Sequence, residues 1–107
     1  MARLSRLTWI PSKLAYKLRF HELALKEWQR LDGSVRESFK KKLAERLQNP
    51  RVPASALHGM ADCYKIKLAS LGYRLVYRVD DQEIFVTVIA AGKREKSKVY
   101  RAAQQRL

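Results

Sequence analysis

Cysteine and long apolar runs are nearly absent from this sequence. Its 107 residues include one cysteine, Cys63, so an internal disulfide is excluded and a reducing compartment, the cytoplasm, is expected. With no histidine beside it, Cys63 is interpreted as structural. No segment approaches the roughly 20 apolar residues that span a bilayer. Arg6 and Pro11 interrupt the start of the chain, which makes it a poor signal peptide, and no membrane partner is expected.

Common catalytic patterns are also missing. The sequence has no HxxxE motif, no paired carboxylates and no cluster of metal ligands, so neither a metal site nor a cofactor is expected. The two histidines, His21 and His58, lie far apart in the sequence and in different elements. Each is interpreted as a surface or packing residue rather than a catalytic one.

Acidic residues are few compared with basic ones. Ten Asp and Glu stand against 23 Lys and Arg, a formal charge of +13, while 47% of the residues are hydrophobic. The hydrophobic content predicts a single globular domain rather than a disordered basic tail. Such a charge excess repels itself in the compact state, and a polyanionic partner is its usual explanation. Nucleic acid is the first candidate partner and an acidic protein the second.

The apolar periodicities predict an α+β fold with the element order β-α-α-β-β-β-α. Residues 15–21 alternate apolar and polar side chains, as a strand with one buried face does. Residues 22–31 have helical spacing, and Asp32-Gly33 makes the turn into a second helix with apolar residues every four positions. In that second helix, Ser34 and Glu37 match a capping box, with Ser34 at the N-cap.

The second half of the chain predicts a meander followed by a helix. Asn49-Pro50 ends the second helix, and residues 51–61 form a long connection that is a candidate contact loop. Residues 62–79 read as a hairpin, and residues 83–91 as a central strand covered on both faces. Residues 93–107 form a basic terminal helix. A small, mostly antiparallel sheet is therefore expected to pack on the N-terminal helical hairpin.

The hairpin DCYKIKLASLGYRLVYRV carries cations of one sign between its apolar residues. A two-residue turn at Leu71-Gly72 predicts three cross-strand pairs: Ala69 with Arg74, Lys67 with Val76, and Lys65 with Arg78. In this register one face is apolar and the other holds four cations: Lys65, Lys67, Arg74 and Arg78. Like charges on neighbouring strands repel, and a phosphate backbone would relieve this. The alternative is that these long side chains extend into water.

If the partner is RNA, cleavage is a candidate reaction because RNA carries its own nucleophile, the 2′-hydroxyl. An enzyme must help to deprotonate that hydroxyl, neutralise the phosphorane and protonate the leaving 5′-oxygen. Arginine forks suit phosphate oxygens. A lysine can act as the base only when its amine is neutral. Clustered like charges favour the neutral form, which makes Lys65 or Lys67 a candidate base. As a nuclease site this set is incomplete, so part of its geometry is expected to come from outside the protein.

The segments ALKEWQRL, VRESFKKKL, DCYKIKL, GYRLVYRV and GKREKSKVY together resemble the RelE family of bacterial toxins, in the same order and without large gaps. The resemblance covers about residues 15–107. It implies a small α/β toxin that enters the ribosomal A site, against 16S rRNA and mRNA, and cuts the mRNA there. Attack by the 2′-hydroxyl is expected to leave a 2′,3′-cyclic phosphate. A RelB-like antitoxin is the implied inhibitor, and operator DNA is expected as a partner only through the complex with that antitoxin.

The resemblance also implies roles for individual residues. Lys65 and Lys67 of the KIK motif are candidates for proton abstraction and phosphate neutralisation, and Arg74 of GYR for transition-state stabilisation. Arg94 of GKRE matches an arginine near the leaving group, where charge stabilisation suits its very high pKa better than general acid catalysis. Candidate substrate-binding residues complete the set: Tyr100, which matches a tyrosine stacked on an mRNA base, Arg78 and Lys93. The alternative for Tyr100 is a core tyrosine of the terminal helix.

Two departures from the family pattern are visible. His58 precedes Gly59-Met60 where close relatives have an arginine, which puts one backbone contact in doubt. Residues 1–14 have no counterpart and are expected to be either a disordered extension or the product of a mis-called start. Leu14 aligns with the initiator methionine of shorter relatives, and a TTG codon both encodes leucine and initiates translation.

Two other functions remain open from the sequence. A ParE-like toxin that inhibits DNA gyrase shares the fold without needing the set Lys65, Lys67, Arg74 and Arg94. A plain RNA-binding protein would bind in a salt-sensitive manner without cutting the strand. Primer extension on an mRNA with and without ribosomes distinguishes all three.

Overall fold

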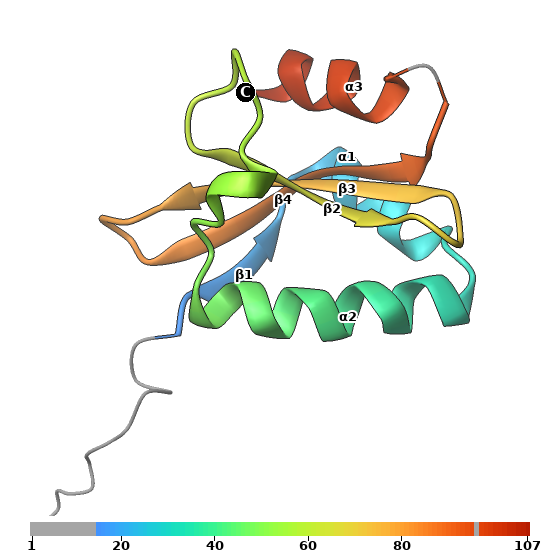
Figure 1. Ribbon diagram of the computed structural model, residues 1–107, viewed down its shortest axis with the longest axis horizontal. Helices are drawn as coiled ribbons and strands as arrows, with labels where there is room; N and C mark the ends of the chain where they lie inside the picture. Colours follow the sequence, from blue (N-terminus) through green and yellow to red (C-terminus); the bar gives the residue numbers. More distant parts are fainter. Residues whose placement is uncertain (1–14, 96) are drawn as a thin grey trace, which may run out of the picture.

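The computed structural model describes residues 15–95 and 97–107. Its elements are, in chain order, β1 (Lys17–Phe20), α1 (Glu22–Gln29), α2 (Gly33–Gln48), the 3₁₀ turn η2 (Pro53–Ser55), β2 (Cys63–Leu68), β3 (Tyr73–Asp80), β4 (Phe85–Lys93) and α3 (Lys98–Arg106) (Figure 1). The predicted α+β class and the order β-α-α-β-β-β-α are confirmed. Both alternatives for residues 1–14 concern a segment outside the described residues.

The four strands form one sheet with the order β1-β4-β3-β2. Strands β2, β3 and β4 make the expected antiparallel meander. Strand β1 is parallel to β4 and pairs only with its first half, from Lys17 opposite Phe85 to Phe20 opposite Val88. The sheet is therefore mostly antiparallel, as predicted, and β4 leaves half of one edge without a strand partner.

The helices cover both faces of the sheet, α2 on one face and α3 on the other (Figure 1). The larger core packs α1 and α2 against one face, with Phe39, Leu43, Leu75 and Tyr77 among its members. The smaller core lies beneath α3 on the opposite face and contains Met60, Cys63, Val76, Ile89, Ala90, Val99 and Ala103. The prediction that the apolar strand β4 is covered on both faces is confirmed.

A β-bulge interrupts the alternation of β4 side chains between the two cores. Val76 pairs with Ala90, whereas the next residue, Tyr77, pairs with Val88, so Ile89 is the extra residue. A bulge re-aims the side chains that follow it. Val88 belongs to the larger core, and Ile89 and Ala90 belong to the smaller one.

The predicted capping box is wrong. Helix α2 begins at Gly33, its N-cap is Asp32, and no side chain caps it. Because the helix starts two residues earlier than predicted, Ser34 lies inside its first turn and cannot take the N-cap role. Glu37 instead contacts Lys40 on the exposed surface at 3.1 Å. The predicted end of the helix is confirmed, with Gln48 as its last residue.

Among the described residues, no helix combines the length and the apolar character that crossing a membrane requires. Helix α2 has 16 residues, and its buried side chains Val35, Phe39 and Leu43 follow one stripe. The other faces of α2 carry charged residues, including Lys40, Lys41 and Lys42, all exposed. This is the pattern of a helix packed on a core by one side.

Candidate nucleic-acid interface

The cations of the β2–β3 hairpin lie on one face of the sheet, as the sequence predicts. Lys67 pairs directly with Arg74, and Lys65 pairs with Val76. Directly opposed residues share a face, so Lys65, Lys67 and Arg74 form a row on the face that α3 partly covers. Alternate residues of the same strands fill the larger core on the other face: Tyr64, Ile66, Leu68, Leu75 and Tyr77.

The predicted register is wrong by two positions. The turn has four residues, 69–72, and Leu68 pairs with Tyr73, whereas the sequence predicted a two-residue turn. Gly72 has a φ of +74°, and its N–H donates to the carbonyl oxygens of Leu68 (2.8 Å) and Ala69 (3.3 Å). These bonds draw two more residues into the turn. An even shift leaves every side chain on its own face, so the cationic face is unaffected by the error.

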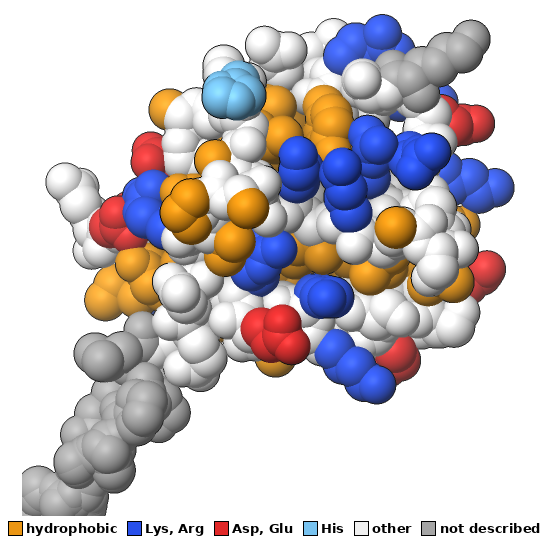
Figure 2. Space-filling model, viewed as in Figure 1, with side chains coloured by type: hydrophobic (Ala, Val, Ile, Leu, Met, Phe, Trp, Pro, Cys, Tyr) orange, Lys and Arg blue, Asp and Glu red, His pale blue; other side chains and the backbone are white. Residues whose placement is uncertain are grey.

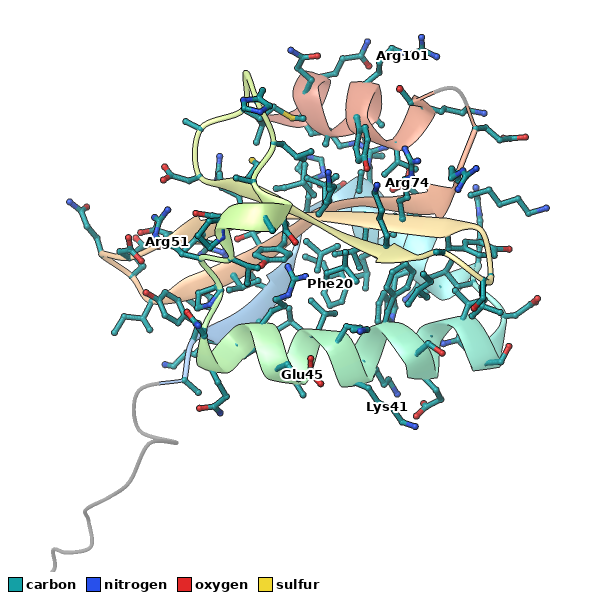
Figure 3. All side chains as sticks on the ribbon, viewed as in Figure 1. Phe20, Lys41, Glu45, Arg51, Arg74 and Arg101 are labelled. Atoms are coloured by element: carbon teal, nitrogen blue, oxygen red, sulfur yellow. The ribbon has the colours of Figure 1, made fainter. Side chains whose placement is uncertain are left out.

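Arg74 is held between the hairpin and helix α3 (Figure 3). Its Cζ lies 5.0 Å from the centroid of the Tyr100 ring, within the range of a cation–π contact. In the described part of the chain, Arg74 Nε and the Tyr100 hydroxyl are buried and have no hydrogen-bond partner. Unpaired buried polar atoms cost stability. The pair therefore holds an N–H donor and a hydroxyl whose hydrogen-bonding capacity is not used within the described residues.

Tyr100 lies between the smaller core and the cationic row. It is half-buried and packs against the smaller core, as a core tyrosine would. Its ring also lies against Arg74, at the edge of the cationic row. The ring is therefore at the candidate site, and its stacking on a base stays a prediction.

Arg94 and Lys93 lie where β4 leaves the sheet. Both side chains are exposed, and the Arg94 N–H donates to the Gly72 carbonyl oxygen at 2.8 Å, which ties the residue to the β2–β3 turn. Arg94 lines a shallow surface hollow with Glu95 and two further cations, Lys98 and Arg101 of α3. The structure thus places Arg94 at the same end of the sheet as Lys67 and Arg74.

Arg78 lies at the other end of the sheet. It is four residues from Arg74 along β3, about 13 Å at the usual rise of a strand. It lines a second hollow with Arg51 and three carboxylates, those of Asp62, Asp80 and Asp81. In that hollow Arg51 forms ion pairs with Asp81 (2.7 Å) and Asp62 (3.0 Å). Arg78 shares the predicted face, but the structure separates it from the other candidates.

The two ends of the sheet differ in whether carboxylates accompany their cations, and we name them accordingly. The paired end consists of Arg51, Asp62, Arg78, Asp80 and Asp81, and the open end of Lys65, Lys67, Arg74, Arg94, Lys98 and Arg101. Ion pairs found within the described ranges include none with a cation of the open end. Figure 2 shows Lys and Arg side chains gathered on the face between α3 and the hairpin. In Figure 3, Arg51 and Arg74 lie toward opposite sides of the molecule.

Other candidate residues have structural surroundings. Cys63 is buried in the smaller core, and burial raises the pKa of its thiol although the nearby Arg78 charge opposes this. His21 Nδ1 accepts the Leu23 N–H at 3.1 Å as the N-cap of α1, and His58 is exposed in the 51–61 loop. Over residues 15–95 and 97–107, no three His, Cys, Asp or Glu side chains are grouped as metal ligands would be.

Sequence reasoning missed Lys98 and Arg101 as members of the open end. Both were included only as part of a basic terminal helix. Their spacing of three residues puts them on one face of a helix. Once Arg94 is placed before the helix, that spacing predicts a shared surface, which the structure contains.

Comparison with known proteins identifies the family. The family described as "ParE toxin of type II toxin-antitoxin system, parDE" matches residues 18–97. The chain is 57% identical over 94 residues to the mRNA interferase toxin RelE of Escherichia coli strain K12, a match that covers 88% of this chain and 99% of that protein. The mRNA interferase RelE of Shigella flexneri matches with the same identity and coverage.

Solved structures agree with this assignment. A mutant of the E. coli toxin RelE in the free state matches with a TM-score of 0.81 at 57% identity, covering 87% of this chain and 98% of that one. The toxin in the intact E. coli RelBE toxin–antitoxin complex matches with a TM-score of 0.74 at 58% identity, covering 77% of this chain and 100% of that one. By sequence identity over most of its length and by fold, this chain belongs to the RelE family of type II toxin–antitoxin toxins.

Proposed function

We propose that this chain is the toxin of a type II toxin–antitoxin system and that it cuts mRNA in the ribosomal A site. The proposal is carried by the cationic row of Lys65, Lys67 and Arg74, which lies on one face in a chain 57% identical to an mRNA interferase toxin. No ion pair within the described residues neutralises this row. Such a surface suits the phosphate backbone of a nucleic acid.

The proposed reaction is an in-line transfer within the RNA strand. The 2′-oxygen forms a bond to phosphorus while the bond between phosphorus and the 5′-oxygen breaks, which leaves a 2′,3′-cyclic phosphate and a 5′-hydroxyl. The 2′-hydroxyl proton passes to the neutral amine of Lys65 or Lys67, the two lysines of the cationic row. The leaving oxygen takes a proton from the surrounding water. RNA supplies the nucleophile, so the scheme requires no metal.

Arginine side chains supply the charge stabilisation in this scheme. Arg74 lies opposite Lys67 and has a buried Nε without a partner in the described residues, so it is assigned to the phosphorane oxygens. Arg94, beside the β2–β3 turn, is assigned to the charge that develops on the leaving oxygen. Tyr100 is assigned to stacking on an mRNA base next to Arg74, and Lys93 and Arg78 to weaker contacts with the backbone.

The ribosome is proposed to complete the site. The open end is a shallow, exposed surface, and such a surface does not hold a flexible strand in the geometry of in-line attack. Alignment supplied in advance can be worth about 7–11 kcal/mol. A codon held in the A site has that alignment, so the toxin needs to add only charge, a base and a stacking ring. Free protein is expected to bind naked mRNA and to cut it poorly.

A RelB-like antitoxin is the proposed inhibitor. The E. coli relative has been solved in complex with RelB and with a peptide of RelB. A charge of +13 and an open cationic face both suit an acidic protein segment. Covering the open end or displacing α3, which carries Tyr100, would each prevent cleavage.

The test is primer extension on a defined mRNA, first with purified protein alone, then with programmed ribosomes, and then with the antitoxin added. Cuts that appear only with ribosomes and disappear with antitoxin are expected, and a chelator should leave them unchanged. Efficient, codon-phased cutting of naked mRNA would contradict the proposed dependence on the ribosome. A DNA-damage response in cells without mRNA cuts would favour the gyrase-inhibiting alternative, and salt-sensitive binding without any cut would favour a plain RNA-binding protein.

A further inference from the structure

Helices α1 and α3 lie on opposite faces of the sheet and are joined by one ion pair. The guanidinium of Arg106, the last residue of α3, donates to both carboxylate oxygens of Glu27 in α1: Nη1 to Oε1 at 2.8 Å and Nη2 to Oε2 at 2.9 Å. The Arg106 side chain is 13% exposed and that of Glu27 is 30% exposed. This bidentate pair is the best enclosed of the ion pairs within the described residues.

The same two side chains satisfy the open edge of β4. Strand β1 pairs with β4 only as far as Val88, so the backbone groups that follow on this edge of β4 have no strand partner, while its other edge pairs with β3. Arg106 Nη1 donates to the Ile89 carbonyl oxygen at 2.9 Å, and the Ala91 N–H donates to Glu27 Oε1 at 3.1 Å. Backbone groups at a sheet edge need such partners. Glu27 and Arg106 thus each supply one hydrogen bond to β4 where a longer β1 would have paired.

Helix α3 has few other attachments. It has nine residues, too few for an isolated helix to be stable in water, and only Val99 and Ala103 are fully buried in it. Its N-cap, Ser97, has a φ of +62° and makes no capping hydrogen bond with its side chain. Small apolar side chains bury little surface, and Tyr100 and Ala102 add partly buried contacts with the smaller core. The ion pair adds a polar attachment at the C-terminal end of α3.

Tyr100 depends on the position of α3. It precedes Arg106 by six residues, about 9 Å along the helix axis, and its ring lies 5.0 Å from Arg74 Cζ. We propose that Glu27 and Arg106 are positioning residues, which hold α3 so that Tyr100 stays against Arg74 in the mRNA site. The proposal rests on the proposed function for its effect on cleavage, while its effect on α3 is independent of that function.

Variants of the two residues test this role. Arg106→Met keeps the apolar stem and removes every guanidinium bond, and Glu27→Gln keeps the shape and an oxygen acceptor for Ala91 while removing the charge. Glu37→Gln, which breaks an exposed pair with Lys40 on α2, is the matched control. Arg106→Lys keeps the charge but loses the fork that reaches Glu27 and Ile89 together.

The first measurement is amide hydrogen exchange of the free protein, which does not depend on any activity. In Arg106→Met, amides of residues 101–106 are expected to exchange about tenfold faster or more, equivalent to about 1.4 kcal/mol, while those of β3 keep the parental rates. Glu27→Gln and Arg106→Lys should show smaller increases, and Glu37→Gln none. Parental exchange in α3 of both Arg106→Met and Glu27→Gln would overturn the proposal.

The second measurement is the single-turnover cleavage rate on programmed ribosomes, together with the concentration that half-saturates it. Arg106→Met is expected to cut about tenfold more slowly with an unchanged half-saturating concentration, whereas a loss of folded protein would leave the rate at saturation unchanged. Faster exchange in α3 with parental cleavage would overturn the positioning role. If the parental protein itself does not cut, the proposed function fails, and the exchange result alone decides whether the pair holds α3.

Discussion

The paired end and the open end of the sheet both carry arginines, but the arginines of the paired end lie among more carboxylates. At the paired end, three carboxylates surround two arginines, and Arg51 is held by Asp81 and Asp62. At the open end, Lys67 faces Arg74, and among the described residues Glu95 is the one carboxylate that lines the hollow beside Arg94. An arginine held by carboxylates in its own chain has less to offer an external anion. We therefore propose that the paired end serves mainly the fold and that the open end carries the proposed RNA cleavage.

The largest effect is expected from removing an arginine of the open end. Arg74→Ala and Arg94→Ala should each lower single-turnover cleavage on the ribosome by about 10²-fold or more, roughly 3 kcal/mol, the scale of one lost charge stabiliser. Ribosome binding should survive, because the remaining cations carry most of the attraction for phosphates. Lys41→Ala, which removes one exposed charge from the outer surface of α2, is the control. A parental cleavage rate in either arginine variant would show that residue to be an ordinary surface arginine.

A smaller effect is expected from Arg78, although it shares the sheet face with Arg74. It lies among the acidic residues of the paired end. Arg78→Ala should lower cleavage at saturating protein by less than about fivefold, the effect of a surface charge worth at most about 1 kcal/mol. The measurement is the same single-turnover assay. A loss as large as that of Arg74→Ala would mean that RNA reaches along the whole face and that the division into two ends is wrong for function.

Arg51, at the paired end, is expected to affect stability rather than cleavage. Its guanidinium bonds Asp81, Asp62 and the Tyr64 hydroxyl, which joins the 51–61 loop to the β3–β4 turn. Arg51→Met should lower the free energy of unfolding by about 1 kcal/mol or less, since the pair is partly exposed to solvent. Cleavage at saturation should not change. Thermal unfolding measures the loss of stability, and the ribosome assay measures cleavage. A cleavage defect without a stability defect would contradict the structural role of Arg51.

Which face the cations occupy could be predicted from the sequence, but their cross-strand partners could not. Alternation along β2 and β3 survives any even error in register, so the shared face of Lys67 and Arg74 was found although the turn was wrong. The turn length depends on backbone hydrogen bonds from Gly72 that no periodicity encodes. Likewise, α2 begins two residues earlier than predicted, so Ser34 is not the N-cap and the capping-box match was misleading.

The ion pairs of Arg51 and Arg106 could not be predicted from the sequence for a different reason. Arg51 and Asp81 are separated by 30 positions and meet only because the β3–β4 turn folds back beside the 51–61 loop. Glu27 and Arg106 are separated by 79 positions and meet at an edge that exists only because β1 is short. Local patterns locate side chains on elements, and the pairing of charges is decided when the elements pack. The sequence therefore predicted the candidate cations of the site, but it could not show that Arg51 and Arg106, which lie outside that set, form ion pairs with carboxylates.

The smallest expected effect is a dependence of stability on pH that arises at the paired end. Hydrogen bonds from Arg51, and then from the Tyr16 hydroxyl at 2.6 Å, hold the pKa of Asp81 below its ordinary value of 3.8. The stabilisation is therefore complete above that value and is lost as the pH falls through the lower, folded-state pKa. The same hydrogen bond to Asp81 raises the pKa of Tyr16 above its ordinary value of 10.0. Its contribution is complete below that value and is lost as the pH rises through the folded-state pKa.

Substitutions separate the loss of stability in acid, through Asp81, from the loss in alkali, through Tyr16. Asp81→Asn should be less stable than the parent near neutral pH. The difference between their unfolding temperatures should shrink as the pH falls from about 4 through the lower, folded-state pKa, where the parental carboxyl becomes protonated in the folded protein as well. Tyr16→Phe should lose its difference from the parent only in strong alkali, where the parental phenol ionises. Thermal unfolding at acid, neutral and alkaline pH is the measurement. Asp80→Asn is the control, because its Oδ1 accepts only local N–H groups of the turn, those of Gln82 and Glu83. A difference between Asp81→Asn and the parent that persists unchanged into acid would mean that this carboxylate does not stabilise the fold through Arg51 and Tyr16.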